Sequence, residues 1–394
     1  MRIALVSQEY PPETAHGGIG TQTYAKAHGL AALGHEIHIV SHAIGPDRRD
    51  YVDGSVRVTR VPGPDFRLPI RTDAARWLAY SVEVTATVAC LHARAPFDLI
   101  DFPEWAGEGY FHLLNRTDWD RVPTVIHLHG PLVMFAHALG WPEVDSELYR
   151  VGMHMEATCV RLADAVLSSS RCSADWCARH YGLDAARVPV LHTGVDTTHF
   201  RPGGRKADRP TVIFVGKIAA TKGINVLVDA ALQAAHDVPG LRLELIGRGE
   251  PTFLAGLKAR VADAGCPDLL DVIGFAGKDD LPARLARAHV FAAPSLYEGG
   301  PGFVYLEAMA CGLPAIACSG SGASEVIRDG ETGLLVAPGD VDTLAATLRQ
   351  LLIDTGRREA IGRAARQYVE AEADSRICIR RFEAFYADVA GRRA

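Results

Sequence analysis

Long hydrophobic runs are absent from this sequence of 394 residues. No stretch approaches the roughly 20 apolar residues that a transmembrane helix needs. The apolar run at the N-terminus ends at Ser7 and is followed at once by the polar Gln8 and Glu9, which is too early for a signal peptide. We therefore expect a cytoplasmic protein with at most peripheral contact to a membrane.

A strong excess of one charge is absent as well. The formal net charge is -6, and acidic and basic residues are interspersed along the chain. Such a charge distribution produces no global field that would attract nucleic acid. The eight cysteines form no Cys-x-x-Cys pair, and most lie in apolar surroundings, as reduced core cysteines do. We expect no nucleic-acid partner, no disulfides and no zinc.

The chain is long enough for two domains of similar size. Short apolar runs alternate with segments of helical periodicity twice over, which predicts α/β domains with parallel sheets covered on both faces. The expected strands are residues 2–7, 36–41, 97–102, 124–129, 165–168 and 188–192 in the first half, and 211–216, 241–247, 270–275, 290–293, 315–318 and 334–337 in the second.

The segment from Thr197 to Pro210 is rich in proline, glycine and charge, which is typical of a linker between domains. We expect an N-terminal domain over residues 1–203 and a C-terminal domain over residues 204–374. In the last segment, 375–394, residues 376–389 have the pattern of a helix with no strand after it.

The most informative segment spans residues 294–338. It begins after the expected strand 290–293 and places two carboxylates, Glu298 and Glu307, on either side of a glycine loop. Where a parallel strand is followed by a helix, free backbone N–H groups can bind phosphates, and carboxylates can bind sugar hydroxyls. The segment therefore predicts a ligand site at the carboxyl edge of the second sheet.

Three further motifs follow strand ends. A glycine loop with Gly17, Gly18 and Gly20 opens the first helix, where backbone can approach a pyrophosphate. A His-Gly pair at His129 ends the strand 124–129. Two cations, Lys217 and Lys222, lie in a glycine-punctuated loop after the strand 211–216, and both can reach a diphosphate.

Together these motifs resemble the family 4 glycosyltransferases, which are retaining enzymes. The resemblance implies the GT-B fold, in which two Rossmann-like domains have parallel sheets facing across a cleft. It implies that a C-terminal helix crosses back to the N-terminal domain, and that the enzyme needs no metal and no tightly bound cofactor.

The resemblance also implies roles for individual residues. His129 and Glu298 position the transferred sugar, Lys217 and Lys222 stabilise the leaving diphosphate, and Glu307 binds the ribose. The other residues that the resemblance places at the nucleotide sugar are Gly17, Gly18, Gly20, Gly216, Arg248, Gly274, Phe275, Gly300, Gly302, Phe303 and Val304.

Departures from the family pattern affect several of these site residues. Lys217 stands where arginine is usual, so a single ammonium group replaces a guanidinium that can donate two parallel hydrogen bonds to a phosphate. Arg248 stands where an acidic residue is common. Eight residues separate Glu298 from Glu307, where the family has seven, and the glycine loop between them is the place to absorb the extra residue. The role of Glu298 at the sugar depends on that loop.

The acceptor side is expected in the N-terminal domain. Asp101 lies near the end of the expected strand 97–102, and Glu104 and Trp105 follow it. Two acids with a tryptophan suit the hydroxyls and the ring face of a sugar. The alternative for this segment is a packed tryptophan in a loop with solvated acids.

The pattern thus predicts a retaining glycosyltransferase that moves a sugar from a nucleoside diphosphate, with a UDP-sugar favoured and GDP-mannose as the alternative. The acceptor is a hydroxyl of a glycan, a lipid-linked saccharide or a small glycoside. A nucleotide-sugar epimerase or hydrolase on the same fold, or a non-catalytic binder of nucleotide sugars, is the alternative. An NAD-dependent oxidoreductase is disfavoured because the first loop lacks Gly-x-Gly-x-x-Gly and the segment 38–42 offers no acid for a ribose.

Overall fold

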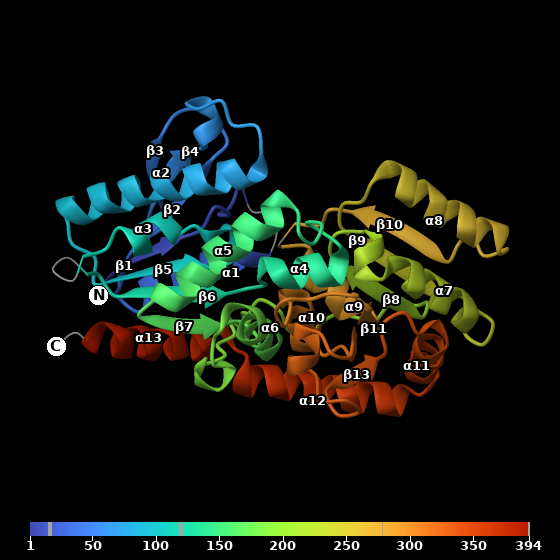
Figure 1. Ribbon diagram of the computed structural model, residues 1–394. Coiled ribbons are helices and arrows are strands. Elements are labelled where there is room, and N and C mark those ends of the chain that lie inside the picture. Colours follow the sequence, from blue (N-terminus) through green and yellow to red (C-terminus); the bar gives the residue numbers. More distant parts are fainter. Residues whose placement is uncertain (15–17, 118–120, 278, 393–394) are drawn as a thin grey trace. The chain divides into compact units, whose positions relative to one another are not determined.

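The computed structural model describes residues 1–14, 18–117, 121–277 and 279–392 (Figure 1). The chain forms two compact units. Unit 1 comprises residues 1–193 together with 375–394, and unit 2 comprises residues 194–374. Each unit has its own sheet and its own buried apolar core, as expected for two α/β domains.

Unit 1 is built on a seven-stranded sheet in the order β3-β4-β2-β1-β5-β6-β7. All its pairings are parallel except that of β3 with β4. The strands are β1 (Arg2–Val6), β2 (Glu36–Ala43), β3 (Arg49–Asp53), β4 (Val56–Pro62), β5 (Leu99–Pro103), β6 (Thr124–Leu128) and β7 (Ala165–Ser168).

The helices of unit 1 follow its strands in the chain. Serine and threonine caps begin several of them: Ser146 accepts a hydrogen bond from Tyr149 N in α5, and Ser170 accepts one from Ser173 N in α6. The helices are α1 (Gly18–Ala32), α2 (Asp73–Arg94), α3 (Tyr110–Leu114), α4 (Leu132–Leu139), α5 (Glu147–Leu162), α6 (Arg171–Tyr181) and α13 (Ser375–Gly391), with short 3-10 turns η1 (Pro64–Phe66), η2 (Trp105–Gly107) and η3 (Ala185–Arg187).

The C-terminal helix α13 belongs to unit 1 and packs against α1 (Figure 1). Phe382 and Tyr386 are fully buried in the same apolar cluster as residues of β1 and β2. The side chain of Ile379 meets the helix α1 at Gly29, where an added Cβ would lie 2.6 Å from it. The last helix of the chain is therefore an integral part of the first unit's core.

Unit 2 has a six-stranded, fully parallel sheet in the order β10-β9-β8-β11-β12-β13. Its strands are β8 (Thr211–Val215), β9 (Arg242–Ile246), β10 (Leu270–Gly274), β11 (Val290–Ala293), β12 (Ala315–Cys318) and β13 (Gly333–Val336). Its helices are α7 (Ile224–Ala235), α8 (Pro251–Asp263), α9 (Leu281–Arg287), α10 (Phe303–Ala310), α11 (Val341–Ile353) and α12 (Thr355–Glu372), with 3-10 turns η4 (Ala220–Lys222) and η5 (Gly322–Val326).

Two expectations about the strands of unit 1 were wrong. Residues 188–192 form no strand, because Pro189 has no N–H for a ladder, and the segment makes a single bridge from Val190 to Ser168. The hairpin of β3 and β4 was not expected. Its strand β3 is short and largely exposed at the sheet edge, so the apolar pattern is weak there, although Gly54 in the two-residue turn is a hairpin signal.

The first unit ends at Thr193, ten residues before the expected boundary. Residues 194–200 belong to unit 2 because they bond to its last helix. Val195 N donates to Ala373 O at 2.9 Å, and the Arg366 guanidinium donates to Phe200 O at 2.7 Å. Among the described residues, no helix is both long and apolar enough to cross a membrane.

Candidate active site

Three glycines at the carboxyl ends of β8, β9 and β10 shape one side of the candidate site. Gly216, Gly247 and Gly274 have φ of 148°, 145° and 82°, values that side chains rarely adopt. A Cβ on Gly247 would lie 1.8 Å from Gly216 O, so the two backbones approach as closely as glycine allows. This edge of the unit 2 sheet therefore presents bare backbone.

Lys222 and Glu298 meet at the same edge, although 76 residues separate them. Lys222 Nζ donates to Glu298 Oε1 at 2.7 Å, and both side chains keep partial access to solvent. Gly223 brings the two segments together: its φ is 70°, and a Cβ there would lie 1.8 Å from Pro294 O. The structure thus joins the cation predicted for the diphosphate to the carboxylate predicted for the sugar.

The glycine loop between the two glutamates is braced by the segment after β12. Gly322 N donates to Glu298 O at 2.9 Å, and a Cβ on Gly322 would come within 2.8 Å of the backbone of Gly300. Gly302, with φ of 69°, then begins α10, so glycine conformations accommodate the longer loop. Phe303 and Val304 open this helix and are half-buried, as is Glu307 one turn later.

Lys217, Arg248 and Phe275 lie on the loops that follow β8, β9 and β10. Lys217 is exposed and makes no ion pair with any described residue. The Arg248 guanidinium lies 5.5 Å from the centre of the Phe275 ring, which is 74% exposed. An exposed phenyl ring beside a cation, next to three strand ends, offers a flat surface for a planar group.

In unit 1, His129 follows the end of β6. Its ring centre lies 4.1 Å from that of His127. Burial, together with the charge of Lys26, holds the pKa of His129 well below its usual range. The imidazole is therefore neutral at neutral pH, with one nitrogen that donates and one that accepts a hydrogen bond.

The structure corrects two of the three expected acceptor contacts. Asp101 is 2% exposed, and its carboxylate accepts hydrogen bonds from Lys26 Nζ at 2.8 Å and from the Tyr386 hydroxyl. Glu104 is fully buried and accepts from His129 N and Gly130 N. Both acids therefore hold unit 1 together and are closed to an acceptor.

Trp105 is the one residue of that segment that keeps partial exposure. Its ring packs against Phe135 at 4.9 Å, Trp77 at 5.7 Å and Trp141 at 6.3 Å between ring centres. Trp141 is 49% exposed. These four residues, which we call the aromatic cluster, were not foreseen as a group because they come from three separate segments: α2, η2 and the stretch from α4 to Trp141.

The first glycine loop is described in part. Gly17 lies outside the described residues. Gly18 begins α1 and is exposed, and Gly20 N donates to the Glu9 carboxylate at 3.2 Å. The N-terminus of α1 thus has an anionic partner from its own chain, as the helix dipole favours.

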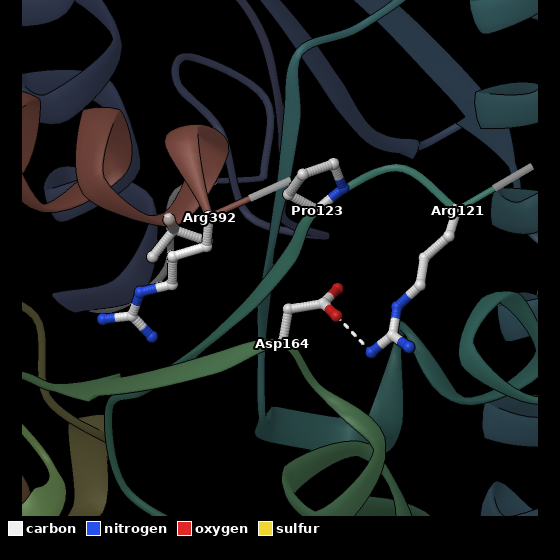
Figure 2. A pocket seen from close by; sticks show the side chains of 5 residues that line it. Arg121, Pro123, Asp164 and Arg392 are labelled. Carbon is white, nitrogen blue, oxygen red and sulfur yellow. Dashed lines mark hydrogen bonds and ion pairs between the residues drawn. The ribbon is translucent and has the colours of Figure 1, made fainter. Parts of the chain in front are cut away.

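A cavity of about 250 Å³ lies elsewhere on unit 1 (Figure 2). Arg121, Pro123 and Asp164 line it where β6 and β7 begin, and Arg392 lines it from the end of the chain. Arg121 pairs with Asp164 across this cavity. Ligands of parallel sheets bind at the carboxyl ends of the strands, so this cavity at the amino ends is separate from the candidate site.

Among the described residues, no three His, Cys, Asp or Glu side chains are grouped to hold a metal ion.

Two known families match consecutive parts of the chain. Residues 17–194 match the family described as "Glycosyl transferase 4-like domain", and residues 195–368 match "Glycosyl transferases group 1". A curated relative from Mycobacterium tuberculosis, named GDP-mannose-dependent alpha-(1-6)-phosphatidylinositol monomannoside mannosyltransferase, is 34% identical, and the match covers 94% of each chain. Glycogen synthase of the same organism is 28% identical, over 95% of this chain and 91% of the relative.

Solved structures show the same fold. Sucrose-phosphate synthase from Thermosynechococcus elongatus superposes with a TM-score of 0.82 at 23% identity, covering 98% of each chain. HepE from Anabaena in complex with UDP-glucose superposes with a TM-score of 0.74 at 21% identity, covering 98% of this chain and all of that one.

Proposed function

The chain belongs to the family 4 glycosyltransferases and has their GT-B fold, and from this premise we propose that it is a retaining enzyme. It transfers a sugar from a nucleoside diphosphate to a hydroxyl group. The bond from the anomeric carbon to the diphosphate breaks, and the bond from that carbon to the acceptor oxygen forms on the same face of the sugar. The proton of the acceptor hydroxyl passes to the departing diphosphate.

The ion pair of Lys222 and Glu298 is the observation that carries this proposal. A diphosphate gains negative charge as it departs, and a fixed ammonium group stabilises that charge more in the transition state than in the ground state. When the diphosphate takes Lys222 as its partner, the Glu298 carboxylate is released to accept a hydrogen bond from a sugar hydroxyl. Lys217, which is exposed, supplies a second cation.

We assign the nucleoside to the strand ends of β9 and β10. The exposed ring of Phe275 provides a stacking face for the base, and the Glu307 carboxylate accepts hydrogen bonds from the ribose. Sequence patterns favoured a UDP-sugar, with GDP-mannose as the alternative. Three curated relatives at 30–34% identity are named as GDP-mannose-dependent, and we therefore put GDP-mannose first.

On the acceptor side we propose the aromatic cluster in place of Asp101 and Glu104. The half-buried Trp105 and the more exposed Trp141 present ring faces on which a sugar ring or an apolar portion of an acceptor can pack. The relatives named in the comparisons act on acceptors that include a phosphatidylinositol mannoside, which combines both features.

A donor screen tests the proposed function. GDP-mannose, UDP-glucose and ADP-glucose are offered separately without an acceptor, so that water takes the acceptor's place, and release of the nucleoside diphosphate is measured. We expect GDP-mannose to be turned over fastest. NMR of the first sugar released should show the donor's anomeric configuration.

Other results of the screen would support the alternatives. Release of the inverted anomer would contradict a retaining mechanism. A donor converted to its epimer, with no diphosphate released, would indicate an epimerase. A release rate that no added acceptor hydroxyl changes, with no glycoside formed, would indicate a hydrolase. Tight binding of a nucleotide sugar without turnover, with or without added acceptors, would indicate a non-catalytic binder.

The two glutamates should separate sugar binding from nucleotide binding. We expect Glu298→Gln to lower turnover without weakening free GDP, because only the sugar loses a partner. Glu307→Gln should weaken free GDP by about 1.5 to 3 kcal/mol, the contribution of a hydrogen bond to a charged group. Calorimetry with GDP measures both variants.

Glu359→Gln is a matched control, because Glu359 is an exposed glutamate on α12 of the same unit and pairs with Arg363 at 3.7 Å. It should leave both turnover and GDP binding unchanged. If Glu307→Gln binds GDP as tightly as the parent while Glu298→Gln loses it, the assignment of the two carboxylates is reversed.

A further inference from the structure

Two buried glutamates bind every backbone N–H group of the turn that carries His129. The turn runs from His129 to Leu132, and Pro131 has no N–H to donate. His129 N and Gly130 N both donate to Glu104 Oε1, at 2.7 and 2.6 Å. Leu132 N, at the start of α4, donates to Glu156 Oε2 at 2.9 Å. The conformation of the turn therefore depends on two carboxyl groups.

The two glutamates reach the turn from different elements. Glu104 follows β5, the strand next to β6, whereas Glu156 lies in the middle of α5. Glu156 also accepts from Ala106 N at 3.2 Å and from the Tyr181 hydroxyl at 2.6 Å. It thereby ties the segment after β5, the turn after β6 and the helix α6 together.

This arrangement lowers the stability of the folded state, because both glutamates are fully buried and lose their contact with water. Burial raises the pKa of Glu104 to about 7, against the backbone hydrogen bonds that lower it. Burial also raises the pKa of Glu156, and the Glu104 charge raises it further. Glu104 Oε2 has no hydrogen-bond partner among the described residues. Hydrogen bonds from backbone N–H groups to a carboxylate are shorter and stronger than those between neutral groups, so the two glutamates hold this turn more firmly than neutral acceptors would.

We propose that Glu104 and Glu156 are positioning residues that hold His129 in the orientation that sugar transfer requires. The inference rests on the proposed function, in which His129 acts on the transferred sugar. The glutamates touch neither donor nor acceptor; they act through the backbone of the turn. A misplacement of about 1 Å in a group that orients a substrate can cost about 100-fold in rate.

Substitution of Glu104 gives the first test. Glu104→Ala should lower kcat for GDP-mannose turnover by about 100-fold with little change in KM, because the donor's main contacts are elsewhere. Glu104→Gln should restore most of the activity, since one side-chain oxygen already accepts both N–H bonds. If Glu104→Ala does not fold, Glu104→Met fills the same space without accepting hydrogen bonds and replaces it.

Val160→Ala is the control for lost stability. Val160 is a buried residue of α5, the helix of Glu156, and its truncation removes apolar contacts without removing a hydrogen bond. Hydrogen exchange measures the turn directly. The amides of His129 and Gly130, which donate to Glu104, should lose protection in Glu104→Ala and keep it in Val160→Ala and Glu104→Gln. Unchanged protection at these amides in Glu104→Ala would overturn the proposal.

A double-mutant cycle separates this inference from the proposed function. His129→Ala should lower turnover, and Glu104→Ala should add little in that background, because the group it positions is gone. Full additivity of the two losses would overturn the positioning role and leave the proposed function intact. If His129→Ala turns over the donor at the parent rate, the role of His129 is wrong, and the positioning role falls with it.

Discussion

Replacing Lys222 by alanine should lower the rate of sugar transfer by a hundredfold or more without unfolding the protein. The ammonium group is assigned to the leaving diphosphate, and removal of one such preorganised contact costs about 2.7 to 4 kcal/mol of transition-state stabilisation. The fold should survive, because Lys222 lies in a surface turn and its ion pair with Glu298 is partly exposed. The rate of diphosphate release at saturating GDP-mannose, together with a thermal unfolding curve, measures both expectations.

Lys258→Ala is the matched control. Lys258 is an exposed lysine on α8 of the same unit, and its removal changes the net charge equally. It should keep the parent rate. A Lys222→Ala enzyme that turns over saturating donor as fast as the Lys258→Ala enzyme would exclude Lys222 from the mechanism.

Replacing Asp101 by alanine should destabilise unit 1 by about 3 to 5 kcal/mol, the cost of leaving the other member of a buried ion pair uncompensated. Lys26 Nζ donates to Asp101 Oδ2 at 2.8 Å, and the two side chains are 4% and 3% exposed. The Tyr386 hydroxyl donates to the same carboxylate, so the substitution also removes a hydrogen bond between α13 and β5. Urea unfolding followed by tryptophan fluorescence reports on unit 1, because all five tryptophans fall within residues 77–176.

Two further variants make this expectation specific. Glu36→Ala removes a surface partner of Arg2, whose pair should contribute less than about 1 kcal/mol. The double variant Lys26→Met with Asp101→Leu removes both charges and should recover much of the lost stability. Equal effects of Asp101→Ala and Glu36→Ala would show that the buried pair contributes no more than an exposed one.

Much of the fold could be predicted because apolar runs of strand length are local signals. The strands of unit 2 lie within a residue or two of the expected ranges, since a parallel sheet covered on both faces demands continuous apolar segments. The edge strand β3 escaped prediction because an exposed edge strand needs no such segment. The buried strand β4 was missed although Val56, Val58 and Val61 give it an apolar pattern. The segment 188–192 was predicted as a strand from its apolar pattern, although Pro189, which has no N–H for a ladder, is a sequence signal against one.

In the candidate site, too, some features could be predicted from local sequence and others could not. The sequence by itself predicted Lys222, Glu298 and the glycine loops as site residues, because strand ends and turn residues mark the ligand edge of a parallel sheet. It could not show that Glu298 pairs with Lys222 across 76 residues, nor that Asp101 and Glu104 are buried.

Those facts were decided by tertiary structure alone, for a physical reason. An aspartate or glutamate after a strand has the same local pattern whether it faces solvent or core. Its environment depends on distant segments: α1 and α13 enclose Asp101, while the turn at His129 and Gly130 binds Glu104. Burial and pairing are properties of the packed fold. In that fold Asp101 forms a buried ion pair with Lys26, and Glu104 accepts a hydrogen bond from the backbone of His129, so neither is an acceptor contact.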